Sequence, residues 1–134
     1  MKKILLVTLM LVTSLLSFAT SGRDAEITFE KTTHNFGTFP ESNPKVTCTF
    51  KFKNTGDGPL VIHQAIASCG CTVPLFPKEP IQPGEEGTII VSYNGAGRFP
   101  GHFKKSITIR TNGKREMTRL FIQGDMLPQA EEAK

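Results

Sequence analysis

Lys45-Val46-Thr47-Cys48-Thr49-Phe50-Lys51-Phe52-Lys53 is the stretch of sequence that decides the fold. Apolar residues occupy every second position from Val46 to Phe52, and threonine or lysine occupies the positions between them. Because successive side chains of a β-strand point to opposite faces, this alternation predicts a strand with one buried and one solvated face. Such a strand is typical of antiparallel sheets that cover a core on one side.

The same alternation recurs along the chain, interrupted by turn residues about every 8 to 12 positions. Pro74 to Pro83 contains four prolines, so we expect an edge strand or a crossover there. Asn54 to Pro59 predicts a turn, and Asn112-Gly113 predicts a tight hairpin with both residues at positive φ. The pattern predicts an all-β, immunoglobulin-like β-sandwich of seven to eight antiparallel strands. The expected strands span residues 27–30, 34–39, 45–53, 60–66, 68–73, 87–93, 102–111 and 115–123.

The first 19 residues differ from the rest of the chain. Lys2 and Lys3 precede an apolar run from Ile4 to Leu16, and Ser17-Phe18-Ala19 has the small residues that signal peptidase reads. The apolar stretch is shorter than the about 20 residues that a membrane span needs. We therefore expect a signal peptide over residues 1–19, cleaved after Ala19, rather than a retained anchor. The protein is then periplasmic or extracellular.

The remaining 115 residues carry 14 Lys and Arg against 12 Asp and Glu, since two of the 16 basic residues lie in the leader. This near balance argues against a dedicated nucleic-acid-binding protein, which carries clustered basic charge. The length allows one domain. We expect a linker at residues 20–25, the sandwich at 26–124, and a flexible C-terminal tail at 125–134, where the periodicity ends.

Ser68-Cys69-Gly70-Cys71-Thr72 is the unusual motif of the sequence. In an extended strand Cys69 and Cys71 point to the same face, about 6.6 Å apart. A disulfide requires Cβ atoms about 3.5 to 4.5 Å apart, so a bond between them needs a bend, which Gly70 permits. Such a bond would be easily reduced, as in redox rather than structural disulfides.

Two thiolates on one face also supply half of a site for a soft metal such as copper or zinc, with His63 or His34 as a further ligand. The simpler interpretation is that the cysteines pack as small apolar side chains or form a structural bridge. Three single bridges are open (48–69, 48–71 and 69–71), each with a spare thiol. Cys48 shares a face with Phe50 and Phe52, which predicts a core thiol.

Nothing in the sequence predicts a catalytic site. The three histidines fall in different expected strands, and the chain has neither a nucleophile-elbow motif nor a phosphate-binding loop. The last hairpin collects basic residues that could meet an anionic surface, although such residues more often solubilise strands and protect a sheet edge. These residues are Lys104, Lys105, Arg110, Lys114, Arg115 and Arg119.

Several blocks together resemble a known family. They are His34–Phe39, Phe50–Ile62, Ser68–Thr72, Ile81–Gly87 and Gly101–Asn112, with a closing Ile122–Gly124. In order and spacing they are similar to the bacterial domain-of-unknown-function family fifteen seventy-three, over about residues 27 to 126. The resemblance implies an immunoglobulin-like sandwich, related in fold to ASPM, SPD-2 and hydin domains and exported to the envelope in bacteria such as Bacteroidetes. It brings no established activity.

We therefore predict an exported single-domain β-sandwich that acts as a non-enzymatic interaction or scaffolding module of the bacterial envelope. We expect protein partners in the cell envelope, no nucleic acid, no integral membrane segment and no cofactor, because strands and turns explain every recognisable block and sheet edges are natural docking strips. The alternative is a soft-metal-binding or thiol-redox protein. It would use Cys69 and Cys71, with His63 completing a copper or zinc site.

Overall fold

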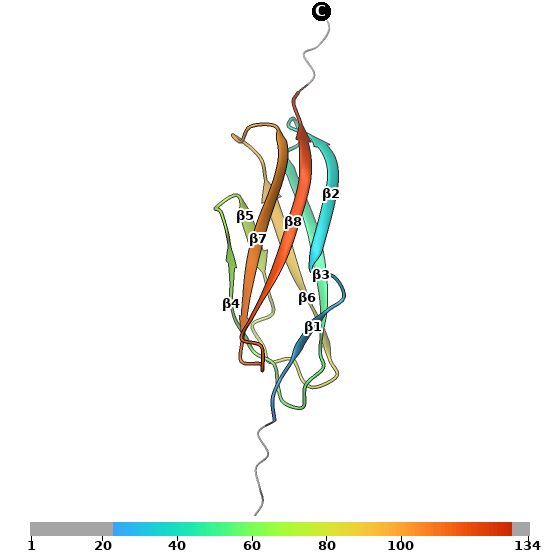
Figure 1. Cartoon of the computed structure of the whole chain (residues 1–134), viewed down its shortest axis with the longest axis vertical. Helices are drawn as coiled ribbons and strands as arrows, with labels where there is room; N and C mark the ends of the chain where they lie inside the picture. Colours follow the sequence, from blue (N-terminus) through green and yellow to red (C-terminus); the bar gives the residue numbers. More distant parts are fainter. Residues whose placement is uncertain (1–22, 130–134) are drawn as a thin grey trace, which may run out of the picture.

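The computed structural model describes residues 23–129, which form two four-stranded sheets packed face to face (Figure 1). The predicted all-β sandwich is confirmed, with eight strands. In spatial order, the first sheet contains β1 (Ile27–Phe29), β3 (Lys45–Asn54), β6 (Glu86–Asn94) and β5 (Thr72–Leu75). The second contains β2 (Thr33–Pro40), β8 (Met117–Leu127), β7 (Gly101–Thr111) and β4 (Ile62–Ala67).

The strand that decided the prediction is β3. Its alternate residues Cys48, Phe50 and Phe52 are buried, while the threonines and lysines between them are exposed. Each large apolar side chain removed from water contributes about 1.5 to 3 kcal/mol, so the paired inner faces drive the assembly of the sandwich. On the two inner faces, fully buried side chains include Ile89 and Val91 of the neighbouring β6, and Ile107, Ile109, Leu120 and Ile122 of β7 and β8 in the facing sheet.

One strand pair is parallel. β2 pairs with β8 in parallel, whereas β1 pairs with β3 antiparallel, so the chain changes sheets between Phe29 and Thr33. The prediction of antiparallel strands was therefore wrong for β2. An alternating apolar pattern looks the same in both pairings, because it reports which face is buried and not the direction of the neighbour.

The N-terminal segment Arg23–Ala25, predicted as part of the linker, packs onto the domain. Ala25 is buried, and the Asp24 carbonyl accepts a hydrogen bond of 2.8 Å from the Asp57 amide. A Cβ at Gly56 or Gly58 would collide with the backbone of this segment. Neither glycine has a positive φ, so both are required for close approach and not for an unusual turn conformation.

Residues 125–127, predicted as the start of a flexible C-terminal tail, belong to β8. β8 runs to Leu127, where Met126 is buried opposite Phe39 of β2, and Asp125 Oδ1 lies 3.0 Å from His102 Nδ1. The prediction was wrong for these residues because β2 and β7 flank β8 to its end, although Gly124 and Asp125 interrupt the apolar pattern.

The Asn112-Gly113 hairpin forms, but not with the predicted turn. Neither residue has a positive φ, and the Thr111 amide donates to the Glu116 carbonyl at 2.9 Å across a longer loop. The Asn112 side chain is used elsewhere: its Oδ1 accepts from the Val61 amide at 2.8 Å and its Nδ2 donates to the Pro59 carbonyl at 3.0 Å. These contacts hold the start of β4 against the loop between β7 and β8.

The predicted signal peptide, residues 1–19 with cleavage after Ala19, lies outside the described residues, as do residues 20–22 and 130–134. Between residues 23 and 129 no helix has the length and apolarity needed to cross a membrane.

Candidate functional site

The residues Ser68–Cys71 form a turn, here named the cysteine turn, that carries the chain from β4 to β5. β4 is an edge strand of one sheet and β5 an edge strand of the other. The Ser68 amide donates to the Ser106 carbonyl of β7 at 2.9 Å, and the Asn94 amide of β6 donates to the Cys71 carbonyl at 2.8 Å. Backbone hydrogen bonds therefore fix the turn to both sheets.

Cys69 and Cys71 are joined by a disulfide. Their Cα atoms lie 5.3 Å apart, closer than the about 6.6 Å of an extended strand, so the predicted bend is present. The strand expected at residues 68–73 begins only at Thr72. The prediction was wrong at residues 68–71 because Cys69, Cys71 and Val73 have the alternating spacing of a strand. Gly70 bends without a positive φ, and a Cβ there would meet nothing within 4 Å.

The bridge closes a loop of three residues, which limits how much it can stabilise the fold. In the chain-entropy model such a loop contributes about 1.6 kcal/mol, against about 3 kcal/mol for a 15-residue loop. Of the three pairings that the sequence left open, the structure has 69–71. It leaves Cys48 as a free buried thiol, as predicted.

The two sulfurs of the bridge have different surroundings. Cys69 is half-buried, whereas Cys71 is 8% exposed. The Cys71 amide donates to Cys69 Sγ at 3.3 Å, and Thr72 Oγ1 lies 3.8 Å from Cys69 Sγ and 3.6 Å from Cys71 Sγ. Both sulfurs therefore have a hydrogen-bond donor within reach, and Cys69 is the less buried of the two residues.

The histidines predicted as further metal ligands do not join the cysteines. His63 lies six residues before Cys69, about 20 Å along a strand, and His34 lies on β2 at the opposite edge of its sheet. Within residues 23–129, no three His, Cys, Asp or Glu side chains are grouped so that they could hold a metal. In the bonded form Cys69 and Cys71 offer no thiolate ligands.

Cys48 is chemically separate from the cysteine turn. It faces the core from β3 and is 6% exposed. Burial raises the pKa of its thiol to about 11, because the low dielectric of the core disfavours the thiolate. At neutral pH this thiol is protonated and shielded from reagents.

The side of β4 that faces away from β7, here named the β4 edge, presents unpaired backbone groups. Ser68 and Ser106 form a hydrogen-bonded position of the antiparallel ladder, and such positions recur at every second residue. Ala65 and Ala67 fall on the alternate positions, so their N–H and C=O groups point away from β7. A strand laid beside them would find two donors and two acceptors.

The other sheet edges in the described part of the chain are protected. β1 is three residues long, β2 is interrupted by a bulge around Gly37, and β5 contains Pro74. Charge, proline, bulges and short length are the usual means of preventing edge-to-edge pairing. β4, with the sequence IHQAIA, has neither a charge nor a proline, and only its start at His63 is irregular.

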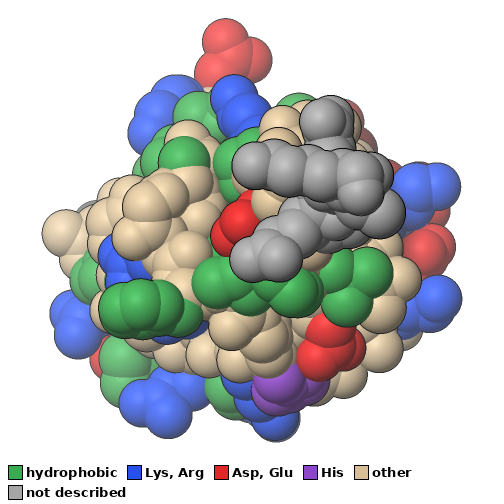
Figure 2. Space-filling view, turned by 90° about the horizontal axis from the view of Figure 1, so that it is seen from above, with side chains coloured by type: hydrophobic (Ala, Val, Ile, Leu, Met, Phe, Trp, Pro, Cys, Tyr) green, Lys and Arg blue, Asp and Glu red, His purple; other side chains and the backbone are tan. Residues whose placement is uncertain are grey.

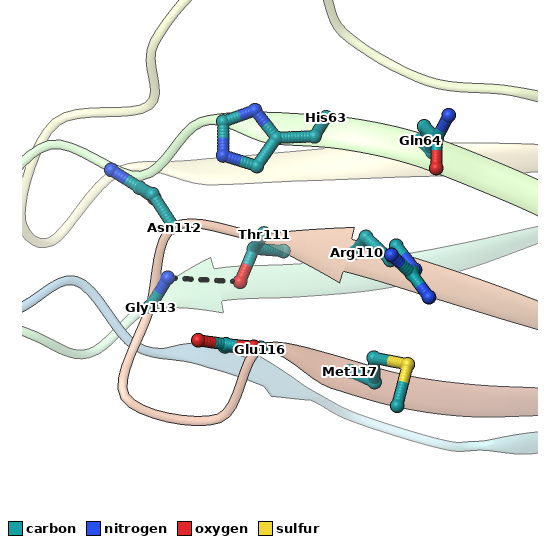
Figure 3. A pocket seen from close by; sticks show the side chains of 8 residues that line it. All are labelled: His63, Gln64, Arg110, Thr111, Asn112, Gly113, Glu116 and Met117. Atoms are coloured by element: carbon teal, nitrogen blue, oxygen red, sulfur yellow. Dashed lines mark hydrogen bonds between the residues drawn. The ribbon is translucent and has the colours of Figure 1, made fainter.

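A hollow of about 400 Å³ lies on the outer face of the sheet, between the start of β4 and the β7–β8 hairpin (Figure 3). Gln64 of β4 is paired in register with Arg110 of β7, and both line it together with His63 and Glu116. Along the same outer face of the sheet, Lys104 and Arg119 are also exposed. The charge on the outer face of β7 and β8, on the β7 side of β4, is therefore mainly positive.

Sequence reasoning missed the β4 edge, as well as several exposed apolar side chains. Phe99 is 98% exposed in the loop between β6 and β7, and Val73 and Leu75 project from β5 beside Ile90. Viewed from the end of the sandwich, hydrophobic side chains form patches among peripheral Lys and Arg (Figure 2). The available signal for the edge was the uncharged run Ile62–Ala67 between charged strands.

A family model described as "Protein of unknown function (DUF1573)" matches residues 27–126, which is most of the sandwich. No curated protein matches the chain.

Three solved structures illustrate the similarity of fold. A protein of unknown function from Porphyromonas gingivalis W83 is 14% identical, with 84% of this chain and 51% of that chain covered and a TM-score of 0.68. The PapD-like domain 7 of human CEP192 is 12% identical, with coverages of 90% and 97% and a TM-score of 0.61. The CupB2 chaperone of Pseudomonas aeruginosa is 16% identical, with coverages of 78% and 57% and a TM-score of 0.51. The chain thus spans about half the length of the Porphyromonas and Pseudomonas proteins that it matches.

Proposed function

The chain belongs to the family of proteins of unknown function DUF1573, and we propose that it is an exported, non-enzymatic module of the bacterial envelope that binds an extended segment of a partner protein along the β4 edge. The observation that carries the proposal is the row of outward backbone groups at Ala65 and Ala67 on a strand without charge or proline. An added strand would satisfy these groups, and main-chain hydrogen bonds supply the affinity in this mode of recognition.

The charge on the outer face of the sheet that β4 ends favours an acidic segment with long side chains directed over that face. Lys104, Arg110 and Arg119 are exposed on the outer face, and Glu116 is the acidic side chain lining the hollow. A partner strand with carboxylates on that face would gain electrostatic complementarity, which governs specificity and association rate more than affinity. Ile66, 49% exposed between the outward alanines, offers an apolar contact to the same segment.

Two further observations support the proposal. The fold is shared with the PapD-like domain 7 of CEP192 and with the CupB2 protein, which is named a chaperone. The leader-like composition of residues 1–19 supports export to the periplasm or beyond. Small sandwiches host many unrelated roles, so the site itself and not the fold carries the argument.

The test uses two synthetic strand peptides of about eight residues, a usual strand length, one alternating valine with glutamate and the other valine with lysine. Nuclear magnetic resonance on the full chain would follow backbone amides. We expect the acidic peptide, and not the basic one, to shift the resonances of Ala65 and Ala67 and to slow the exchange of their amide protons. No binding at millimolar peptide, equal binding of both peptides, or shifts confined to other strands would overturn the proposal.

A matched pair of variants sharpens this experiment. Ala67→Pro removes an outward N–H without removing a donor to β7, because proline is tolerated at such edge positions. Val73→Lys adds a charge on the opposite sheet, on the exposed face of β5. We expect Ala67→Pro to weaken binding of the acidic peptide about fivefold or more, the equivalent of one hydrogen bond, and Val73→Lys to leave it unchanged. The reverse pattern would place the binding surface on β5.

A further inference from the structure

The disulfide in the cysteine turn lies where a thiolate from solvent can reach it. It lies at the junction between two edge strands, with Gly70 exposed between the cysteines and no neighbouring atom within 4 Å of where a Cβ would stand. Cys69 is half-buried and Cys71 is 8% exposed, so Cys69 is the residue of the bridge that is more open to a thiolate from solvent. Accessibility therefore selects which sulfur is attacked.

Hydrogen-bond donors lie where they can stabilise the thiolates that this attack produces. Thr72, itself 4% exposed, holds its hydroxyl 3.6 Å from Cys71 Sγ, where it can donate to a thiolate. The Cys71 amide donates to Cys69 Sγ and can stabilise negative charge on that sulfur. Because backbone bonds to both sheets hold the turn, the S–S bond can open while the fold persists.

We propose that Cys69–Cys71 is a thiol–disulfide exchange site that reacts with the dithiol of a partner protein, with Cys69 as the attacked sulfur and Cys71 as the leaving sulfur. This proposal does not rest on strand addition at the β4 edge. Cys48 takes no part, because it is buried in the core.

The reaction is balanced in two steps. A thiolate of the dithiol attacks Cys69 Sγ; the S–S bond breaks, its electron pair remains on Cys71 Sγ beside the Thr72 hydroxyl, and this thiolate takes a proton from water. The second thiolate of the dithiol then attacks the first dithiol sulfur, which is bonded to Cys69 in the mixed disulfide. The bond between that sulfur and Cys69 breaks, and Cys69 is released as a thiolate. The dithiol is oxidised to a disulfide and the chain is reduced; in reverse, the Cys69 thiolate attacks a partner disulfide and Cys71 resolves the product.

The first measurement treats the native chain with dithiothreitol as the dithiol probe, followed by alkylation and mass mapping. We expect alkylation of Cys69 and Cys71 but not of Cys48, with the amide-exchange protection of β3, β6, β7 and β8 retained. Loss of that protection on reduction would show that the bridge is a structural staple, and would overturn the proposal without touching the β4 edge.

Two single variants assign the roles of the sulfurs. With glutathione disulfide as probe, Cys71→Ser leaves Cys69 to form a stable mixed disulfide, whereas Cys69→Ser leaves the shielded Cys71. We expect the first variant to react at least about tenfold faster, because exposure and thiolate stabilisation control cysteine reactivity. Cys48→Ala is the matched control: reduced beforehand, it reacts with glutathione disulfide at the rate of the reduced native chain. Equal rates in the two single variants would overturn the assignment.

Thr72 is a positioning residue in this proposal. Thr72→Val should move the midpoint of the pH profile for exchange upward, and Thr72→Ser should restore it, since only the hydroxyl donates to sulfur. Unchanged midpoints in Thr72→Val would remove Thr72 from the mechanism.

Discussion

Ser68 and Ser106 are joined by two hydrogen bonds of different kinds. The Ser68 amide donates to the Ser106 carbonyl at 2.9 Å, and the Ser106 amide donates to the Ser68 side-chain oxygen at 3.1 Å. The second bond replaces the backbone carbonyl that would have continued the ladder. β4 therefore ends at this point, and the Ser68 carbonyl is free to turn away with the chain toward Cys69.

The substitution Ser68→Ala tests this ending. It removes the acceptor of the Ser106 amide, so we expect the free energy of unfolding to fall by about 0.5 to 1.5 kcal/mol and the Ser106 amide proton to exchange faster. Urea denaturation and hydrogen exchange measure the two effects. Ser92→Ala is the control, because the Ser92 hydroxyl bonds the hydroxyl of the exposed Thr47 side chain at 3.1 Å and no backbone amide of the described residues. An unaltered exchange rate at Ser106 would contradict the role given to Ser68.

Asn54 is a buried polar side chain that ties three segments together. Its amide nitrogen donates to the carbonyls of Gly58 and Ile81 at 2.8 and 2.9 Å, and its oxygen accepts from the amides of Glu26 and Gly56 at 3.3 and 3.0 Å. Asn54→Ala leaves these groups unpaired, so we expect about 3 kcal/mol of destabilisation in chemical denaturation.

Asn35→Ala provides the comparison for Asn54. Asn35 is exposed, and its side chain accepts one bond, from the Gly37 amide at 2.8 Å. We expect a loss of about 1 kcal/mol or less, because water can replace that acceptor. Similar losses in both variants would mean that burial of the Asn54 network has no special cost.

Cys48 gives stability a dependence on alkaline pH. Its pKa is about 11 in the fold against 9.0 for the unperturbed thiol, so unfolding releases a proton between these values. The contribution of the protonated thiol to the free energy of unfolding is complete below pH 9. It is lost as the pH rises from 9 toward 11, by about 2 to 3 kcal/mol.

The measurement compares urea denaturation of the native chain and of Cys48→Ala at several values from pH 7 to pH 11. The difference between the two curves isolates the thiol, because burial also raises the pKa of Tyr93, which both proteins retain. A constant difference across this range would mean that Cys48 ionises in the fold as readily as in the unfolded chain.

Two glycines differ in whether the fold has room for a Cβ atom. A Cβ at Gly87 would collide with the ring of Phe52, which is 1% exposed, so Gly87→Ala should cost about 1 to 3 kcal/mol. At Gly70 a Cβ would contact no atom within 4 Å, and the φ angle is not positive. Gly70→Ala should therefore change the free energy of unfolding by no more than about 0.5 kcal/mol. Severe destabilisation by Gly70→Ala would show that the cysteine turn does need glycine.

The sequence predicted best where side-chain alternation alone decides the structure. The strand at Lys45–Lys53 and the edge position of the proline-rich segment around Pro74 were both confirmed. In each case the determinant is local: burial of every second side chain, or a missing amide donor that a central strand cannot tolerate.

The prediction failed where contacts with residues far away in the sequence determine the conformation or identity of a residue. Asn112 adopts no positive φ because its side chain bonds Pro59 and Val61, and Gly56 is glycine because Asp24 lies against it. These partners are far apart in sequence, so no local rule reveals them. The β4 edge was missed for a related reason, because an edge is defined by the absence of a neighbour.

The two ends of the described chain leave the sandwich at opposite poles of its long axis, along which the strands run (Figure 1). Interstrand hydrogen bonds lie across the strands, so a pull between residues 23 and 129 loads the contacts of β1 with β3, and of β8 with β2 and β7, in shear. Many bonds must then break together rather than one at a time. Handles at Arg23 and Gly113 would instead pull apart, at lower force, the contact of residues 113–114 with Ala25 at one pole. Tension between residues 23 and 129 is therefore expected to meet more resistance than tension across the sheets.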